Sequence, residues 1–190
     1  MSTKYIDGNY YHLYNQGVHR SAIFFSDENY CYLLRLLKKY STLYKVSVMA
    51  YCLMPNHYHF VLRQNERGSI SRFVQTTFNA YTQAINVQQK IGGTLFQGRA
   101  KSICIDSDRY VLQLIRYIHL NPVIAGLVRN PEDWLFSDYR VWIGLDVNSL
   151  TDRSFRNIYF DNGRAYRKFV EDYRNDMARS QIKKYLLDED

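Results

Sequence analysis

Residues 51–62 read YCLMPNHYHFVL, an apolar run that carries two histidines, His57 and His59, with one residue between them. The Pro-Asn pair at 55–56 is typical of a tight turn, so we predict a β-hairpin of two strands, 45–54 and 57–64. Side chains two residues apart on a strand project from the same face. His57 and His59 are therefore expected to point one way and Tyr58 the other, which leaves two imidazoles on one face to be explained.

The segments around this hairpin alternate between strand and helix patterns. Helical spacing of apolar residues, with Ser or Asp at the start, predicts helices, whereas alternating apolar residues predict strands. In chain order we predict strand 9–18, helix 26–41, the hairpin, helix 69–90, strand 99–106 and helix 107–121, which ends before Pro122. This βαββαβ order predicts an α+β protein with a ferredoxin-like fold, in which strands 9–18 and 57–64 lie at the centre of a four-stranded antiparallel sheet. Two helices are expected on one face, and the helix at 107–121 follows the last strand.

The C-terminal part has a weaker pattern. Residues 133–142 predict a turn and a short helix, and residues 163–187 predict an amphipathic helix. We therefore expect two units, a domain over residues 1–145 and a helical extension over 146–190.

Composition favours a polyanionic partner. The net charge is +7, and residues 63–116 hold eight Lys or Arg against three Asp or Glu, a net of +5 beside the histidines. A basic face of this kind is typical of nucleic-acid binding, although a simply solvated basic surface is the alternative. Three scattered cysteines, Cys31, Cys52 and Cys104, form no CxxC pair, so reduced core thiols are expected. Without a secretory signal pattern or an apolar run of about 20 residues, we expect a cytoplasmic protein with no membrane partner.

The histidine pair suggests a metal site. Two neutral imidazoles can share one divalent ion, and the alternative is a hydrogen-bonded pair without a metal. A third ligand is available on helix 107–121, where Tyr117 and Asn121 are four residues apart on one face. A carboxamide oxygen suits Mg²⁺ or Mn²⁺, and a tyrosine beside such an ion can attack a phosphate. Because the chain has 18 tyrosines, a packing role for Tyr117 is the alternative.

Four stretches together resemble a known family. They are HLYNQGVHRSAIFF (12–25), YCLMPNHYHFVL (51–62), LFQGRAKSI (95–103) and RYIHLNPVIAGLV (116–128). In order and spacing they resemble the REP-associated tyrosine transposases, which belong to the single-tyrosine HUH, or insertion-sequence-200-like, superfamily. The resemblance covers roughly residues 10–143 and implies the same ferredoxin-like core.

The resemblance also implies an activity. It implies a metal-dependent single-stranded DNA endonuclease and strand transferase that acts at DNA hairpins through a 5′-phosphotyrosine intermediate. His57, His59 and Asn121 would bind the divalent metal, Mg²⁺ or Mn²⁺, and Tyr117 would be the catalytic nucleophile. Related transposases carry glutamine at the position of Asn121, so the asparagine has a shorter reach. A monomer is favoured and a homodimer is possible.

Several side chains are candidates for DNA contacts. Phe96 could stack on a base, and the polar or basic side chains are expected on phosphates. The expected DNA-binding residues are Phe96, Gln97, Arg99, Lys101, Arg63 and Arg72. The alternative function is a non-catalytic nucleic-acid-binding module on the same fold. A two-histidine phosphoesterase is disfavoured, because a second H-x-[ST] motif is missing.

Overall fold

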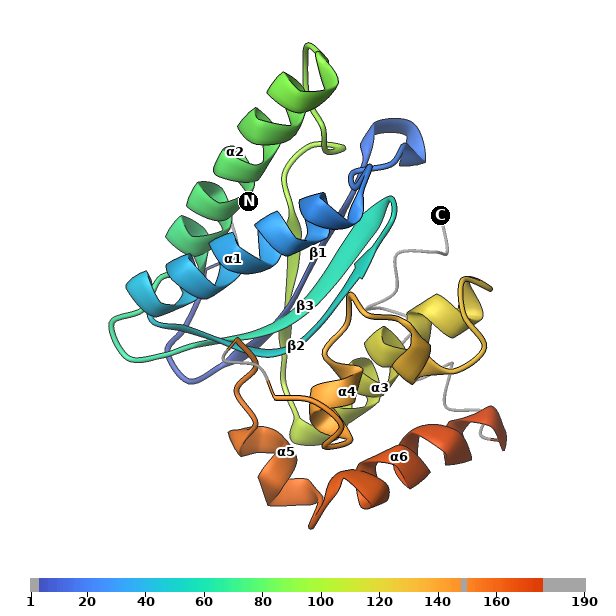
Figure 1. Ribbon diagram of the computed structural model, residues 1–190. Coiled ribbons are helices and arrows are strands. Elements are labelled where there is room, and N and C mark those ends of the chain that lie inside the picture. The colour runs from blue at the N-terminus through green and yellow to red at the C-terminus, as the bar shows by residue number, and fades with distance from the viewer. Residues whose placement is uncertain (1–3, 148–149, 176–190) are drawn as a thin grey trace.

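The computed structural model describes residues 4–147 and 150–175. Figure 1 shows the arrangement of the elements. Their bounds are β1 (Tyr10–Gln16), α1 (Asp27–Leu43), β2 (Val46–Met54), β3 (His57–Gln64), α2 (Ile70–Gln89), β4 (Lys101–Ile105), α3 (Asp108–Ile124), α4 (Tyr139–Trp142), α5 (Ser154–Tyr159) and α6 (Gly163–Glu171). Short 3₁₀ turns cover Val18–Arg20, Pro131–Asp133 and Asp172–Asn175.

The four strands form one sheet in the order β2-β3-β1-β4, and every neighbouring pair is antiparallel. The two central strands are β3 and β1, as predicted. Pro55 and Asn56 make the turn between β2 and β3, where Met54 faces His57. Helices α1 and α2 lie on one side of the sheet, and α3, α4 and α6 lie on the other (Figure 1). The predicted ferredoxin-like α+β fold is confirmed.

Two hydrophobic cores lie on opposite faces of the sheet, and the alternation along β3 divides its side chains between them. The core under α1 and α2 contains Tyr58 and Phe60, whereas the core under α3 contains Val61. Residues of α3 in the second core are Val111, Leu114, Ile115 and Ile118. Because His57 and His59 share the parity of Val61, α3 covers the face to which they point.

Helix α3 begins as predicted but ends later. The Ser107 side chain caps it by accepting a hydrogen bond from Tyr110 N. The prediction that it ends before Pro122 was wrong, because the helix continues through Pro122 to Ile124. A proline removes one backbone donor, and only two helical residues follow it, so the missing hydrogen bond is tolerated near the end. Asn121 therefore lies inside the helix, with its carbonyl accepting from Ala125 N at 2.9 Å.

The C-terminal elements pack against the same core as α3. Phe155 of α5 and Tyr166 and Val170 of α6 belong to that core. Helix α5 was not predicted, and α6 with the following turn covers only part of the expected helix 163–187, whose residues 176–187 lie outside the described part. The division of the chain into a domain and a helical extension at residue 145 stays a prediction. Among the described residues, no helix combines the length and the apolar character needed to cross a membrane.

The three cysteines are free, but only Cys52 is buried. Cys31 and Cys104 are exposed, so the expectation of three core thiols was wrong for these two. Both lie on elements with one solvent-facing side, α1 and the edge strand β4. On such elements the residue type alone does not show whether a side chain points to the core or to solvent.

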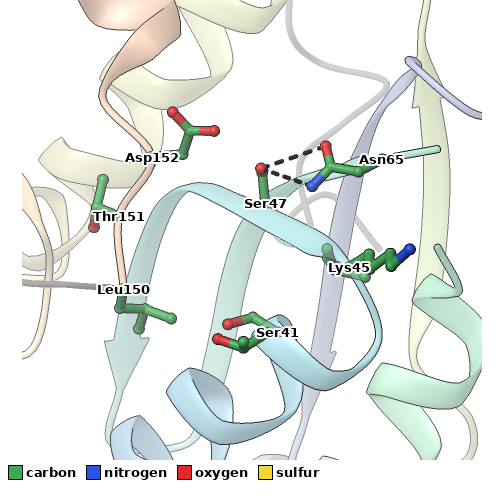
Figure 2. A pocket seen from close by; sticks show the side chains of 9 residues that line it. Ser41, Lys45, Ser47, Asn65, Leu150, Thr151 and Asp152 are labelled. Atoms are coloured by element: carbon green, nitrogen blue, oxygen red, sulfur yellow. Dashed lines mark hydrogen bonds between the residues drawn. The ribbon is translucent and has the colours of Figure 1, made fainter. Parts of the chain in front are cut away.

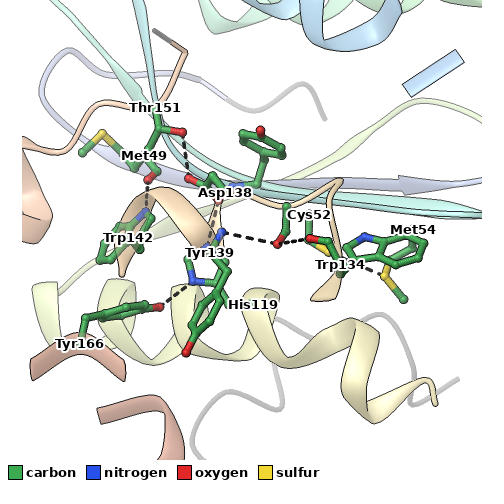
Figure 3. A network of polar contacts seen from close by, with 12 residues as sticks. Met49, Cys52, Met54, His119, Trp134, Asp138, Tyr139, Trp142, Thr151 and Tyr166 are labelled. Atoms are coloured by element: carbon green, nitrogen blue, oxygen red, sulfur yellow. Dashed lines mark hydrogen bonds and ion pairs between the residues drawn. The ribbon is translucent and has the colours of Figure 1, made fainter. Parts of the chain in front are cut away.

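A buried polar network joins α3 to the rest of the chain (Figure 3). His119 contacts the Tyr166 hydroxyl through Nδ1 at 2.6 Å and Asp138 Oδ1 through Nε2 at 2.9 Å. The Asp138 carboxylate also accepts from Tyr51 N at 2.8 Å and from Thr151 Oγ1 at 3.0 Å. One carboxylate thus ties α3, β2 and residues from beyond 145 together in an interior where water cannot replace a lost partner.

We expect Asp138→Ala to lower the free energy of unfolding by about 3 kcal/mol, because it leaves His119, Tyr51 N and Thr151 without their shared acceptor. Urea denaturation followed by circular dichroism measures the change. Asp161→Ala is the matched control, since Asp161 is exposed and should change the free energy by less than about 0.5 kcal/mol. Equal midpoints for both variants would contradict the assignment of this network as a structural anchor.

Candidate active site

His57 and His59 lie where the hairpin pattern predicted them, on the face of β3 that α3 covers. Their ring centroids are 5.1 Å apart, and the ring planes are nearly perpendicular, at 85°. His59 is fully buried, while His57, at the first position of the strand, is partly exposed. Tyr58 between them is in the opposite core, stacked on Phe78. The strand therefore presents two imidazoles to one small region below α3.

The tautomer of His57 follows from its neighbour Asn56. The Asn56 amide nitrogen donates to the carbonyl of Arg20 at 3.2 Å, which fixes the orientation of the carboxamide because a carbonyl can only accept. Asn56 Oδ1 then lies 2.7 Å from His57 Nδ1. That nitrogen must carry the proton, so Nε2 of His57 holds the lone pair that a metal ion requires.

His59 has a partner that the sequence analysis missed. Its Nδ1 lies 3.0 Å from Nε2 of His12 on β1, and the two rings are nearly parallel, with 16° between planes. Burial lowers the pKa of His12 to about 3 and lowers the pKa of His59 well below its ordinary value, so both imidazoles are neutral at pH 7. His12 precedes Tyr14 by two residues, so the alternation of side chains places both on one face of β1, and the pairing of Tyr14 with His59 makes this the face of the histidine pair.

Tyr117 faces His59 from α3, and Asn121 lies one helical turn further along the same helix. The Tyr117 ring lies edge-on to His59, with centroids 6.2 Å apart. Asn121 is 4% exposed, and its side-chain nitrogen has no hydrogen-bond partner within residues 4–147 and 150–175. Half a turn of the carboxamide about χ2 exchanges its nitrogen and oxygen, so the same position can present an oxygen ligand.

The donor set fits a divalent ion. Two neutral imidazole nitrogens and one carboxamide oxygen are acceptable ligands for Mn²⁺ or Mg²⁺, and three protein ligands leave positions for phosphate oxygens and water. Within residues 4–147 and 150–175, no group of three or more His, Cys, Asp or Glu side chains could hold a metal. The assignment of Asn121 as the third ligand stays a prediction.

Tyr117 is only 3% exposed. Nearly all of the Tyr117 residue is therefore covered by its neighbours. Cleavage by this residue would require that DNA binding uncovers the phenol.

Two of the expected DNA-binding residues lie beside the histidines. Lys101 is exposed on β4, and its Nζ lies 5.8 Å from the centre of the Tyr14 ring, which stands between Lys101 and His59 in the strand register. Gln97 accepts a hydrogen bond from Gln16, at 2.5 Å, and Gln16 is paired with His57.

Arg99 occupies the segment between Gln97 and Lys101 and is exposed. The preceding Gly98 has a φ of +76°, a conformation that suits glycine, and its carbonyl accepts from the Asn15 side chain at 3.2 Å. This segment is thus held against β1 at the end of the sheet that carries the histidines.

The other expected DNA contacts are not at this place. Phe96 packs in the opposite core against Tyr58 and Phe78, so the expectation that it stacks on a base was wrong. Arg63 lies six residues along β3 from His57, about 20 Å away, and donates to the carbonyl of Gly8. Arg72 is exposed in the first turn of α2, on the other side of the sheet.

A surface hollow lies at the far end of the same hairpin (Figure 2). It has a volume of about 450 Å³. Its lining residues are Ser41, Thr42, Lys45, Val46, Ser47, Asn65, Leu150, Thr151 and Asp152. Val46 is paired with Gln64, at the opposite end of β3 from His57, so this hollow is separate from the histidine site.

Comparison with known proteins identifies a family and a shared fold. A family model described as "Transposase IS200 like" matches residues 6–121. A solved structure of a REP-associated tyrosine transposase bound to a REP hairpin is 22% identical with a TM-score of 0.64, covering 81% of this chain and 94% of that chain. A putative transposase from Deinococcus radiodurans R1 is 21% identical with a TM-score of 0.44, covering 62% of this chain and 94% of that one. No curated protein matches the chain.

Because His12 is buried and neutral, we predict that the folded protein loses stability in acid. Its folded-state pKa of about 3 lies below its usual value of 6.5, so between these values the unfolded chain binds a proton that the folded chain excludes. The free energy of unfolding should therefore fall as pH drops below about 6.5, by up to about 1.4 kcal/mol per pH unit from His12.

His12→Phe should make this dependence shallower by about one proton, measured by urea denaturation at pH 7, 6 and 5. His19→Gln is the control, because His19 is exposed and should leave the slope unchanged. An unchanged slope in His12→Phe would show that His12 titrates normally in the folded protein.

Proposed function

Because the chain belongs to the IS200-like transposase family, we propose that it is a metal-dependent single-stranded DNA endonuclease and strand transferase that acts at DNA hairpins. The observation that carries the proposal is the ring contact of Tyr117 on α3 with His59, beside His57 on β3; Asn121 follows Tyr117 by one helical turn. The fold shared with a transposase solved on a REP hairpin supports a hairpin substrate.

The metal ligands are His57 Nε2, His59 Nε2 and the Asn121 carboxamide oxygen. When bound, a Mg²⁺ or Mn²⁺ ion would polarise the scissile phosphate and offset the charge that develops there. The protein contributes neutral imidazoles, since burial keeps the pKa of His59 well below its ordinary value. It also contributes Asn56, whose contact with His57 Nδ1 at 2.7 Å orients that ring.

Tyr117 is the nucleophile. Its phenolic oxygen forms a bond to phosphorus while the bond from phosphorus to the 3′ oxygen breaks, which leaves a 5′-phosphotyrosine and a free 3′-OH. The phenol proton passes to water, and the departing 3′ oxygen takes a proton from water. Because the phosphate ester is retained, a second 3′-OH can attack it and restore the strand without ATP.

The DNA strand approaches along the end of the sheet marked by Gln97, Arg99 and Lys101. Contacts there with phosphates raise affinity for any sequence. Since Tyr117 is 3% exposed, DNA binding must also displace the groups that cover it. We place the reaction in the cytoplasm. We also propose that a monomer acts, since the ring centroids of Tyr117 and His59 of the same chain are 6.2 Å apart.

The burial of Tyr117 favours one other function, a nucleic-acid-binding module without catalysis. Such a protein would bind hairpins with the same basic segment and would never expose the phenol. The two functions differ in whether a covalent bond to DNA forms.

We expect the wild-type protein, mixed with labelled hairpin DNA carrying a single-stranded flank and Mn²⁺, to form an adduct that survives on a denaturing gel. EDTA should abolish the adduct. Tyr117→Phe should lose it completely and still bind the hairpin within about threefold of wild type, because only the nucleophilic oxygen is removed.

Tyr110→Phe is the matched control, because Tyr110 lies two turns earlier on α3 and is assigned no chemistry. It should keep the adduct. An adduct in Tyr117→Phe would mean that another residue attacks, whereas no adduct from wild type on any hairpin tested would favour the binding module.

We expect Lys101→Gln to weaken hairpin binding by about three- to tenfold near 0.1 M salt and to reduce the slope of log affinity against log salt by about one. Arg72→Gln removes the same charge on the far side of the sheet and should change affinity by less than about twofold. Fluorescence anisotropy over a salt series measures both variants. Equal losses would indicate a diffuse charge effect and not a contact beside the histidines.

A further inference from the structure

His12 and His59 form a buried pair. His12 Nε2 and His59 Nδ1 are 3.0 Å apart, and both residues are 0% exposed. Among the residues that the structure describes, the two remaining ring nitrogens, His12 Nδ1 and His59 Nε2, have no hydrogen-bond partner. The ring centroids of Tyr14 and His12 are 4.7 Å apart, and this contact helps to hold the His12 ring parallel to the His59 ring.

The distance of 3.0 Å requires one proton between the two rings. Each neutral imidazole carries one N–H, and two facing lone pairs would repel. Either His12 Nε2–H donates to His59 or His59 Nδ1–H donates to His12. In the first arrangement the proton left on His59 Nε2 blocks metal binding. In the second, His59 Nε2 carries a lone pair that is available to a metal ion.

The protein alone does not select strongly between these arrangements. In each of them, one buried N–H lacks an acceptor, on His59 Nε2 in the first and on His12 Nδ1 in the second, at a similar cost of about 1–3 kcal/mol. A cation at the site would select the second, because it bonds to the lone pair on His59 Nε2. His57 differs, since Asn56 already fixes its tautomer.

We propose that His12 is a positioning residue of the metal site, which accepts the Nδ1–H of His59 and so directs the lone pair of His59 Nε2 toward the ion. The inference rests on the proposed function, because it assumes that His57 and His59 bind a divalent metal. No proton enters or leaves the pair when the ion binds. One N–H moves from His59 Nε2 to Nδ1 while the other moves from His12 Nε2 to Nδ1.

Two substitutions of His12 distinguish the effect of losing its hydrogen-bond acceptor from the effect of losing the bulk of its ring. His12→Phe keeps a flat ring but removes the acceptor, and His12→Gln places a carboxamide oxygen near the position of Nε2. Mn²⁺ affinity of the protein without DNA is measured by electron paramagnetic resonance of free Mn²⁺. We expect His12→Phe to bind Mn²⁺ about 10–100-fold more weakly and His12→Gln to stay within about fivefold of wild type.

His19→Gln is the control for removing a histidine, because His19 is exposed, and it should leave Mn²⁺ affinity unchanged. Metal-free hairpin binding should be equal in all variants, which a general loss of structure would not allow. Equal Mn²⁺ affinity of wild type and folded His12→Phe would overturn the role of His12 and leave the proposed function standing. Failure of the wild type to bind Mn²⁺ would overturn both.

Nitrogen-15 NMR of the wild-type protein decides the case even if His12→Phe does not fold. In the presence of Mg²⁺, we expect His59 to be protonated on Nδ1, with a scalar coupling across the hydrogen bond to His12 Nε2. Protonation of His59 on Nε2 in the Mg²⁺-saturated protein would overturn the proposal.

Discussion

The alternation of side chains along β3 is the constraint on which the candidate site depends. Tyr58 belongs to the core under α1 and α2, and its two neighbours point to the other face, beneath α3. A shift of pairing by one residue would exchange the two sets and place an aromatic ring where the imidazoles now meet. The large buried side chains on both faces, such as Phe60 and Val61, make that shift costly, so the cores determine the register that the chemistry needs.

The second requirement is that α3 stays against the sheet, and contacts from distant parts of the chain serve it. His119 is held by Asp138 and Tyr166, while the guanidinium of Arg116 lies over the rings of Phe169 and Tyr173 at 4.4 and 4.2 Å. Arg116 and His119 lie on either side of Tyr117 and Ile118 in the sequence of α3, so these contacts hold the helix at both ends of that short stretch. The segment after residue 145 thus helps to position Tyr117, which precedes that segment by about thirty residues or more.

Local patterns were enough to predict the order of the elements, the hairpin and the shared face of His57 and His59. The spacing of Tyr117 and Asn121 likewise predicted one helical face. What local patterns lack is the register between strands: His12 meets His59 only because β1 pairs with β3 with Tyr14 opposite His59. The direction of Phe96 depends on a loop without periodicity, and the distance of Arg63 from the site depends on how far one strand extends. The end of α3 was misjudged because a proline stops a helix less firmly in its last turn than in its middle.

Tyr117 and Asn121 are borne by one rigid helix, about one turn apart. Any movement of α3 that uncovers the phenol must carry the carboxamide with it. Under the proposed function, exposure of Tyr117 and occupancy of the cation site are therefore linked equilibria. If the moved helix bound the ion less tightly, the ion would in turn restrain the helix by the same free energy.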